Sequence, residues 1–184
     1  MILEIVQYGH PALREKGREI KEIDENIRKM AEDMLETMRD ANGVGLAAQQ
    51  VGVPIQMAVV DVAGIEDRPS AMFIDDVEVK LEEYMPLVLI NPKLTLSKDK
   101  EAGNEGCLSF PDMSAEIVRA AGVRCKAQLL DGTTIEFDAA GLLARALQHE
   151  VDHLNGILFI DRMNSAAKAS IASKLKRLQR DVKG

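Results

Sequence analysis

The chain has 184 residues, 46% of them apolar, which suits one domain with a buried core and argues against a disordered chain. The net charge of −7, from 23 basic and 30 acidic residues, argues against a general nucleic-acid binder, which would carry a basic surface. Because there is no membrane-length apolar run, no signal-peptide pattern and only two cysteines, Cys107 and Cys125, we expect a cytoplasmic protein without a disulfide framework.

The first half of the chain predicts one long helix followed by a buried strand. Asp24 is a suitable N-cap, apolar residues then recur at helical spacing, and Gly43 is a natural end for that helix. A small, glycine-rich segment at 43–52 leads into a β-branched apolar run at 55–62, which is typical of a strand. The mixed, acidic segment that follows has a turn at Asp75-Asp76.

Further strands are expected in the second half of the chain. Two are predicted at 87–91 and 93–97, separated by a proline, and the runs at 123–130 and 134–137 resemble a hairpin closed by Asp131-Gly132. Strands and helices do not alternate as they would in parallel βαβ units. The predicted fold class is therefore α+β, with antiparallel or mixed sheets packed around a central helix.

Two helices complete the prediction. Asp138 is expected to cap the central helix, over residues 139–155, which Gly156 would end. An amphipathic helix is expected over 165–182, near the C-terminus. We interpret residues 1–184 as a single catalytic domain.

The central helix carries the pattern His149-Glu150-Val-Asp-His153, which is typical of a metal site. Positions i and i+4 of a helix share one face, so both imidazoles can bind one ion. Glu150 is rotated by roughly 100°, beside the ion, where it can act as general acid/base on a water molecule. The three residues fall on or beside the apolar half of the helix, and Arg145, Gln148, Asp152 and Asn155 mark the other half. Ionisable groups facing a core are costly unless a metal satisfies them, which makes ordinary core histidines the weaker interpretation.

A catalytic site of the zinc type needs a third protein ligand. His10 is the only other histidine and lies far upstream, and Phe159 stands where a metzincin would need its third histidine. Cys107 lies in a tight segment after Gly106, where the backbone can approach an ion, whereas Cys125 lies in an alternating strand and reads as a packed side chain. The residues favour Cys107 without excluding Cys125.

Three segments, in this order, resemble the motifs of peptide deformylases: Gly43-Val-Gly-Leu-Ala-Ala-Gln-Gln50, Glu105-Gly-Cys-Leu-Ser109 and Gln148-His-Glu-Val-Asp-His153. The resemblance covers nearly the whole chain. It implies removal of the formyl group from formyl-Met N-termini of nascent polypeptides, near the ribosome exit, by a monomer. It also implies that Cys107, His149 and His153 hold one divalent metal beside Gln50. Fe²⁺ would be the physiological ion, and Zn²⁺, Ni²⁺ or Co²⁺ could replace it.

For this chemistry Glu150 would move the proton of an attacking water, and Gln50 and the Leu108 backbone N–H would stabilise the developing oxyanion. Gly45 would let an extended peptide approach the backbone. Candidates to line an apolar methionine pocket are Val44, Phe110, Leu142 and Ala146, although each also fits a plain core role.

The resemblance also marks two departures. Residues 63–86 are longer than the usual connection, which allows an extra hairpin, and Arg145 stands where relatives often carry an apolar residue. Two other functions use the same residues: a zinc peptidase of different specificity, and a structural metal domain, which would need four protein ligands.

Overall fold

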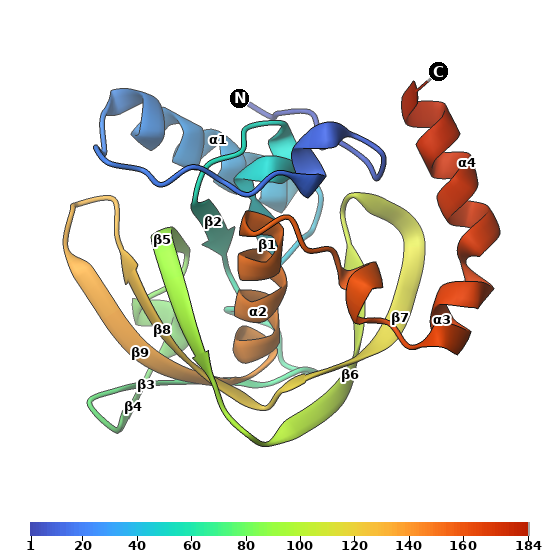
Figure 1. Cartoon of the computed structure of the whole chain (residues 1–184). Coiled ribbons are helices and arrows are strands. Elements are labelled where there is room, and N and C mark those ends of the chain that lie inside the picture. Colours follow the sequence, from blue (N-terminus) through green and yellow to red (C-terminus); the bar gives the residue numbers. More distant parts are fainter. Residues whose placement is uncertain (184) are drawn as a thin grey trace.

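The computed structural model describes residues 1–183, with the side chain of residue 183 left aside. Two sheets surround the central helix α2, and the remaining helices lie at the periphery (Figure 1). The helices are α1 (Glu25–Asp40), α2 (Leu142–Leu154), α3 (Ser165–Ser170) and α4 (Ala172–Lys183). The strands are β1 (Gly45–Ala47), β2 (Met57–Val60), β3 (Ser70–Ile74), β4 (Val77–Val79), β5 (Leu87–Leu96), β6 (Lys100–Cys107), β7 (Phe110–Ala120), β8 (Gly122–Gln128) and β9 (Thr134–Gly141).

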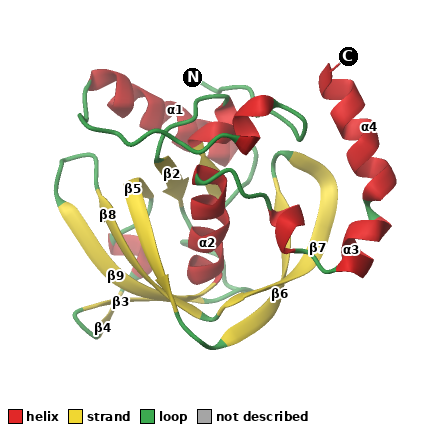
Figure 2. Ribbon diagram, in the orientation of Figure 1, coloured by secondary structure: helices red, strands yellow, loops and turns green. Residues whose placement is uncertain are grey.

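All strand pairs within the sheets are antiparallel, which confirms the α+β prediction. The larger sheet has the order β1-β2-β5-β8-β9-β3-β4, and β6 pairs with β7 in a second sheet. Helix α2 lies between the two sheets and contacts β1, β2, β5 and β9 on one side and β7 on the other (Figure 2). It is therefore largely enclosed, and both sheets can bring side chains to it.

Apolar packing fixes the position of α2. Leu143 and Leu147 have no exposed area and belong to the same cluster as Phe137 of β9. Full burial of a leucine side chain contributes about 1.5–3 kcal/mol, so this face of α2 is firmly held. The polar residues of the helix are positioned as a consequence.

Several element boundaries confirm the sequence analysis. The Asp24 side chain accepts a hydrogen bond from Ile27 N, as expected of an N-cap, and Gly156 after α2 has φ 75°, which favours glycine. The predicted hairpin around Asp131-Gly132 forms between β8 and β9. Residues 63–86 contain a hairpin, because β3 and β4 pair across Asp75-Asp76.

Other boundaries were wrong. The strands expected at 87–91 and 93–97 are one strand, β5, whose register shifts between Ile90 and Lys93. The segment around Cys107, for which no strands were predicted, belongs to the hairpin of β6 and β7. An irregular register absorbs the proline in β5 without ending the strand.

The helices also differ from prediction at two points. Helix α2 begins at Leu142 because β9 continues to Gly141, so Asp138 does not cap it and pairs with Arg124. The C-terminal helix is divided at Ile171 into α3 and α4. Among residues 1–183, no helix combines the length and apolar character that crossing a membrane requires.

Candidate metal centre and active site

The two histidines of α2 lie together on one buried face of the helix. His149 and His153 are one turn apart, their ring centroids are 4.9 Å apart, and both residues are buried. This is the arrangement that i, i+4 spacing predicts. Both rings can therefore turn a nitrogen toward a common point.

The hairpin of β6 and β7 brings the Cys107 thiol to these rings. Cys107 is the last residue of β6, and its Sγ lies 3.4 Å from His153 Nε2. One ligand atom from each of Cys107, His149 and His153 lies within 4.8 Å of the others. A sulfur and two imidazole nitrogens are a donor set that suits Zn²⁺ and related transition metals.

Cys125 is not part of this cluster. It lies on β8 with no exposed area, and burial raises the pKa of its thiol to about 12. It packs in the apolar cluster with Phe137 and Leu143. The sequence preference for Cys107 as the neighbour of the histidines agrees with this placement.

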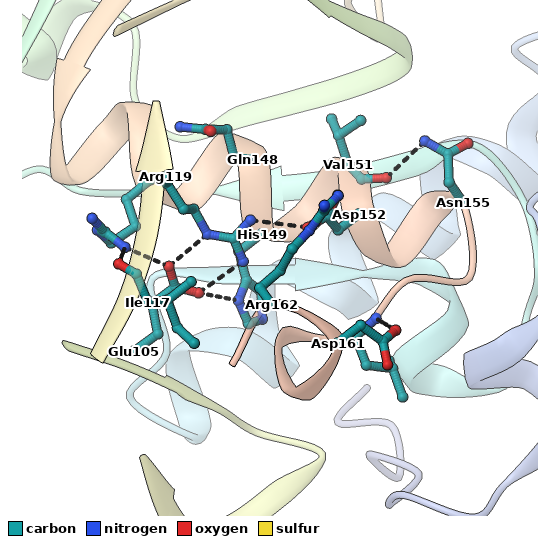
Figure 3. A network of polar contacts seen from close by, with 12 residues as sticks. Glu105, Ile117, Arg119, Gln148, His149, Val151, Asp152, Asn155, Asp161 and Arg162 are labelled. Atoms are coloured by element: carbon teal, nitrogen blue, oxygen red, sulfur yellow. Dashed lines mark hydrogen bonds and ion pairs between the residues drawn. The ribbon is translucent and has the colours of Figure 1, made fainter. Parts of the chain in front are cut away.

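The carboxylate of Glu105 orients His149. Its Oε1 lies 3.0 Å from His149 Nδ1, which leaves Nε2 of that ring free for another partner (Figure 3). Arg119 donates two hydrogen bonds to Glu105, and Arg145 donates a third at 2.7 Å. Burial by itself would raise the pKa of Glu105, but hydrogen bonds from His149 and Arg119 lower it to about 2. Histidines that bind metals commonly donate their other N–H to such a carboxylate.

The electrostatics of the metal-free protein favour positive charge at this cluster. Burial opposes a charge on His149, but hydrogen bonds to Cys107 and Glu105 prevail and raise its pKa well above the usual range. Burial and the neighbouring His149 hold the pKa of His153 well below it. His149 is therefore the ring that favours a proton, and a metal ion at the cluster would have to displace that proton.

Glu150 lies beside the cluster with a carboxylate that is not fully paired. The residue is 5% exposed, and Oε1 is enclosed without a hydrogen-bond partner among the described residues. Burial raises the pKa of Glu150 to about 7, near the value at which a carboxyl group can accept and return a proton at neutral pH. A side chain at Gly45 would collide with this carboxylate, so glycine permits the close approach.

Gln50 connects β1 to the cysteine hairpin. Its Nε2 lies 3.6 Å from Cys107 Sγ and 3.2 Å from Ser109 Oγ, and its Oε1 accepts a hydrogen bond from Ala47 N. These contacts fix which end of the amide faces the cluster. Leu108 lies in the turn between β6 and β7 and is half-buried.

A cavity of about 830 Å³ opens next to these groups, within the usual size range of ligand sites. The predicted pocket residues that line it are Val44, Gly45, Phe110, Leu142 and Ala146. Cys107, Leu108, Gln50, His149 and Glu150 line it as well. Phe110 also stacks on Tyr8 and contacts the edge of Phe159, so it has a core role in addition.

The carboxylate and the arginines behind His149 were not predicted from the sequence. Glu105 and Cys107 both reach the histidines of α2 from β6, but that strand was not predicted. Arg145 was assigned to the polar half of the helix, yet it is 6% exposed. The helical wheel failed because the hairpin of β6 and β7 covers Arg145 and Gln148, which no local pattern records.

Comparisons with known proteins find one family that matches most of the chain. The polypeptide deformylase family model matches residues 2–169. A peptide deformylase of Methylacidiphilum infernorum is 45% identical over 98% of this chain and 94% of that protein. One of Opitutus terrae is 41% identical over 97% and 93%.

Solved structures agree. The crystal structure of peptide deformylase 1B from Arabidopsis thaliana, in complex with an inhibitor, has a TM-score of 0.83 and 36% identity and covers 97% of this chain and 91% of its own. The peptide deformylase of Thermotoga maritima has a TM-score of 0.76 and 36% identity, with coverage of 89% and 99%.

Proposed function

This chain belongs to the polypeptide deformylase family, enzymes that remove the N-formyl group from nascent peptides, and from that premise we propose that Cys107, His149 and His153 hold the divalent metal of the reaction. The observation that carries the proposal is the convergence of these three ligand atoms, within 4.8 Å of one another, beside a cavity and a buried carboxylate. Three protein ligands leave a coordination position open, as catalytic sites require.

The reaction joins a water oxygen to the formyl carbon and breaks the C–N bond, which releases formate and a free amine. When bound, the metal would supply Lewis acidity, which makes water acidic and polarises the formyl oxygen. Glu150 accepts the proton of the attacking water and returns it to the leaving amine. Its raised pKa and its proximity to Gly45 at the cavity wall support this role.

Two donors suit the formyl oxygen as it gains negative charge. The Gln50 side-chain amide is held in place by Ser109 and Ala47, and the backbone N–H of Leu108 follows the metal-binding cysteine directly. Donors that are fixed before the reaction stabilise an oxyanion without reorganisation, and removing one typically costs about 10²–10³-fold in rate.

The substrate's first residue is assigned to the cavity. Val44, Gly45, Phe110, Leu142 and Ala146 would surround a methionine side chain there, because they line the cavity beside the reactive groups. The backbone at Gly45 would pair with an extended peptide, as β-strand addition requires.

A formate-release assay tests the proposed function and its rival. Protein loaded with a divalent metal should release formate from a formyl-Met-Ala-Ser peptide and leave casein uncut. Casein cleavage without formate release would instead identify a peptidase of other specificity.

We propose Fe²⁺ as the physiological ion. Iron beside a soft thiolate is open to oxidation, so the iron enzyme should lose activity in air faster than the nickel or zinc enzyme. Metal analysis after anaerobic purification, followed by matched aerobic decay curves, tests this. Equal decay for all three metals would contradict it.

Finally, we propose that the 184 residues form one catalytic domain that acts as a monomer in the cytoplasm on chains emerging from the ribosome. The enclosure of α2 by both sheets supports a single domain. Few large apolar side chains within residues 1–183 are exposed, which supports a monomer. Light scattering coupled to size-exclusion chromatography tests whether the protein is a monomer.

A further inference from the structure

Arg145 is a buried arginine at the wall of the cavity. It lies on α2 between Leu142 and His149, lines the cavity, and its side chain is only 7% exposed. Its Nη1 donates hydrogen bonds to Glu105 Oε2 at 2.7 Å and to the Ile117 carbonyl at 2.9 Å. A buried guanidinium with fixed partners is a rigid wall, because it cannot swing into solvent without leaving them unpaired.

Gly103 on β6 makes room for this guanidinium. A Cβ at position 103 would lie 2.9 Å from both Cζ and Nε of Arg145, which is too close for a carbon contact. Nη2 on the same side donates to the Glu101 carbonyl at 2.9 Å. The arginine therefore occupies the space that a side chain on β6 would otherwise fill.

Two donors of Arg145 remain available. Of the five N–H groups of the guanidinium, both on Nη1 and one on Nη2 have partners among the described residues, and Nε–H and the second N–H of Nη2 have none. Nε is not among the fully enclosed unpaired atoms, and the residue to which both donors belong lines the cavity. A cationic N–H in such a position forms a stronger hydrogen bond with a well-placed acceptor than a neutral donor does.

We propose that Arg145 determines specificity for the first residue of the substrate, by offering one of its two unpaired N–H groups to an acceptor at the tip of that side chain. Methionine offers a weak sulfur acceptor, whereas methionine sulfoxide presents an oxygen. The inference rests on the proposed function and extends it: formyl peptides that begin with methionine sulfoxide are substrates. The chemistry at the formyl group is unchanged, with water consumed and formate released.

The test compares three formyl peptides that differ only at the first residue: methionine, methionine sulfoxide and norleucine, each followed by Ala-Ser. Norleucine has the length of methionine but no acceptor. In the wild-type enzyme we expect kcat/KM for the sulfoxide within about tenfold of that for norleucine. Arg145→Leu should lower the sulfoxide-to-norleucine ratio by about tenfold or more, because one charge-assisted hydrogen bond is lost.

Arg119→Leu is the matched control. It also removes an arginine from Glu105, but Arg119 does not line this cavity. Overall activity should fall while the ratio stays as in the wild type.

Gly103→Ala provides a second variant that removes no charge. The new methyl group must displace the guanidinium, so the ratio should fall here too, and this variant decides the question if Arg145→Leu does not fold. Calorimetric titration of the metal-free proteins with the product peptides gives a readout without turnover. Arg145→Leu should weaken the binding of the sulfoxide product about tenfold relative to the binding of the norleucine product.

An unchanged ratio in both pocket variants, or a wild-type enzyme that deformylates the methionine peptide but not the sulfoxide, would overturn the inference alone. If the wild type releases formate from none of the three peptides, the proposed function fails and the inference fails with it.

Discussion

The two sides of α2 use buried polar residues in opposite ways. On the side of the metal centre, Glu150 Oε1 and His153 Nδ1 are enclosed and have no partner among the described residues. On the other side, Gln148 makes hydrogen bonds to Ala120 N and O and to Ala144 O, and Asp152 pairs with two arginines. Among the described residues, the helix thus has one side on which Gln148 and Asp152 are paired with protein groups and one side with enclosed polar atoms that are unpaired.

Cavity size does not distinguish the two sides. The second side also borders a cavity, of about 660 Å³, which is lined by Gln148, Asp152 and Arg119 among others. Three of the charged residues that line it, Arg119, Asp152 and Arg162, are already paired with one another (Figure 3). Unpaired polar groups in a buried site cost free energy and persist where a ligand or reaction uses them, so pairing identifies the reactive side better than volume does.

The largest expected effect separates the two carboxylates of the helix. Glu150→Gln should lower kcat/KM by about 10²–10⁴-fold, the usual contribution of a general acid/base, while the bound metal stays the same. Asp152→Asn removes an equivalent charge on the satisfied side and should cause a much smaller loss. Formate release and metal content of both variants are the measurements, and equal losses of activity would contradict the distinction.

The two cysteines give the next test. The pKa of Cys125 is raised from 9.0 to about 12, so its thiolate fraction at pH 8 is about a thousandfold below that of an ordinary thiol. Its reactivity should rise only as the pH approaches 12 or the protein unfolds. In metal-free protein, iodoacetamide should modify Cys107, which lines the cavity, and spare Cys125. Peptide mapping by mass spectrometry measures both, and rapid alkylation of native Cys125 would refute its burial.

Glu105 belongs to both sides, because it joins His149 to Arg119 and Arg145. Glu105→Ala would strand two buried arginines and should lower the free energy of unfolding by about 3–5 kcal/mol and metal affinity by about 10–100-fold. Urea denaturation and competitive metal titration measure these losses. Glu101→Ala, on the same strand with an exposed side chain, should change neither quantity appreciably.

The smallest effect is expected at a partly exposed pair. Asp161 accepts hydrogen bonds from Arg14 at 2.6 and 3.1 Å and from Leu158 N, and although burial opposes it, the Arg14 hydrogen bond lowers the pKa of Asp161 below 3.8. Its contribution to stability is therefore present above pH 3.8 and is lost as the pH falls through the lower, folded-state value.

Asp161→Asn should lower the free energy of unfolding at neutral pH by about 0.5–1 kcal/mol, since Arg14 is half-exposed. The difference from the wild type should shrink in acid. Urea denaturation at neutral pH and in acid measures this difference. A difference that grows in acid would contradict the lowered pKa of Asp161.

The sequence by itself determined the local features. Asp24 marks the start of its helix and Gly156 the end of its helix, as predicted, because capping depends on a few neighbouring residues. The one-turn spacing of His149 and His153 placed both rings on one face for the same reason. The α+β class followed from the order of apolar runs.

Tertiary structure alone decided which charges meet. Glu105 pairs with Arg145, 40 positions away, and with His149, 44 positions away, and the first of these contacts buries a residue that was assigned to the polar half of α2. Likewise β9 continued to Gly141 because β3 was there to pair with it. Periodicity and capping are properties of a short stretch of backbone, whereas the burial and pairing of a side chain depend on which distant segment packs against it.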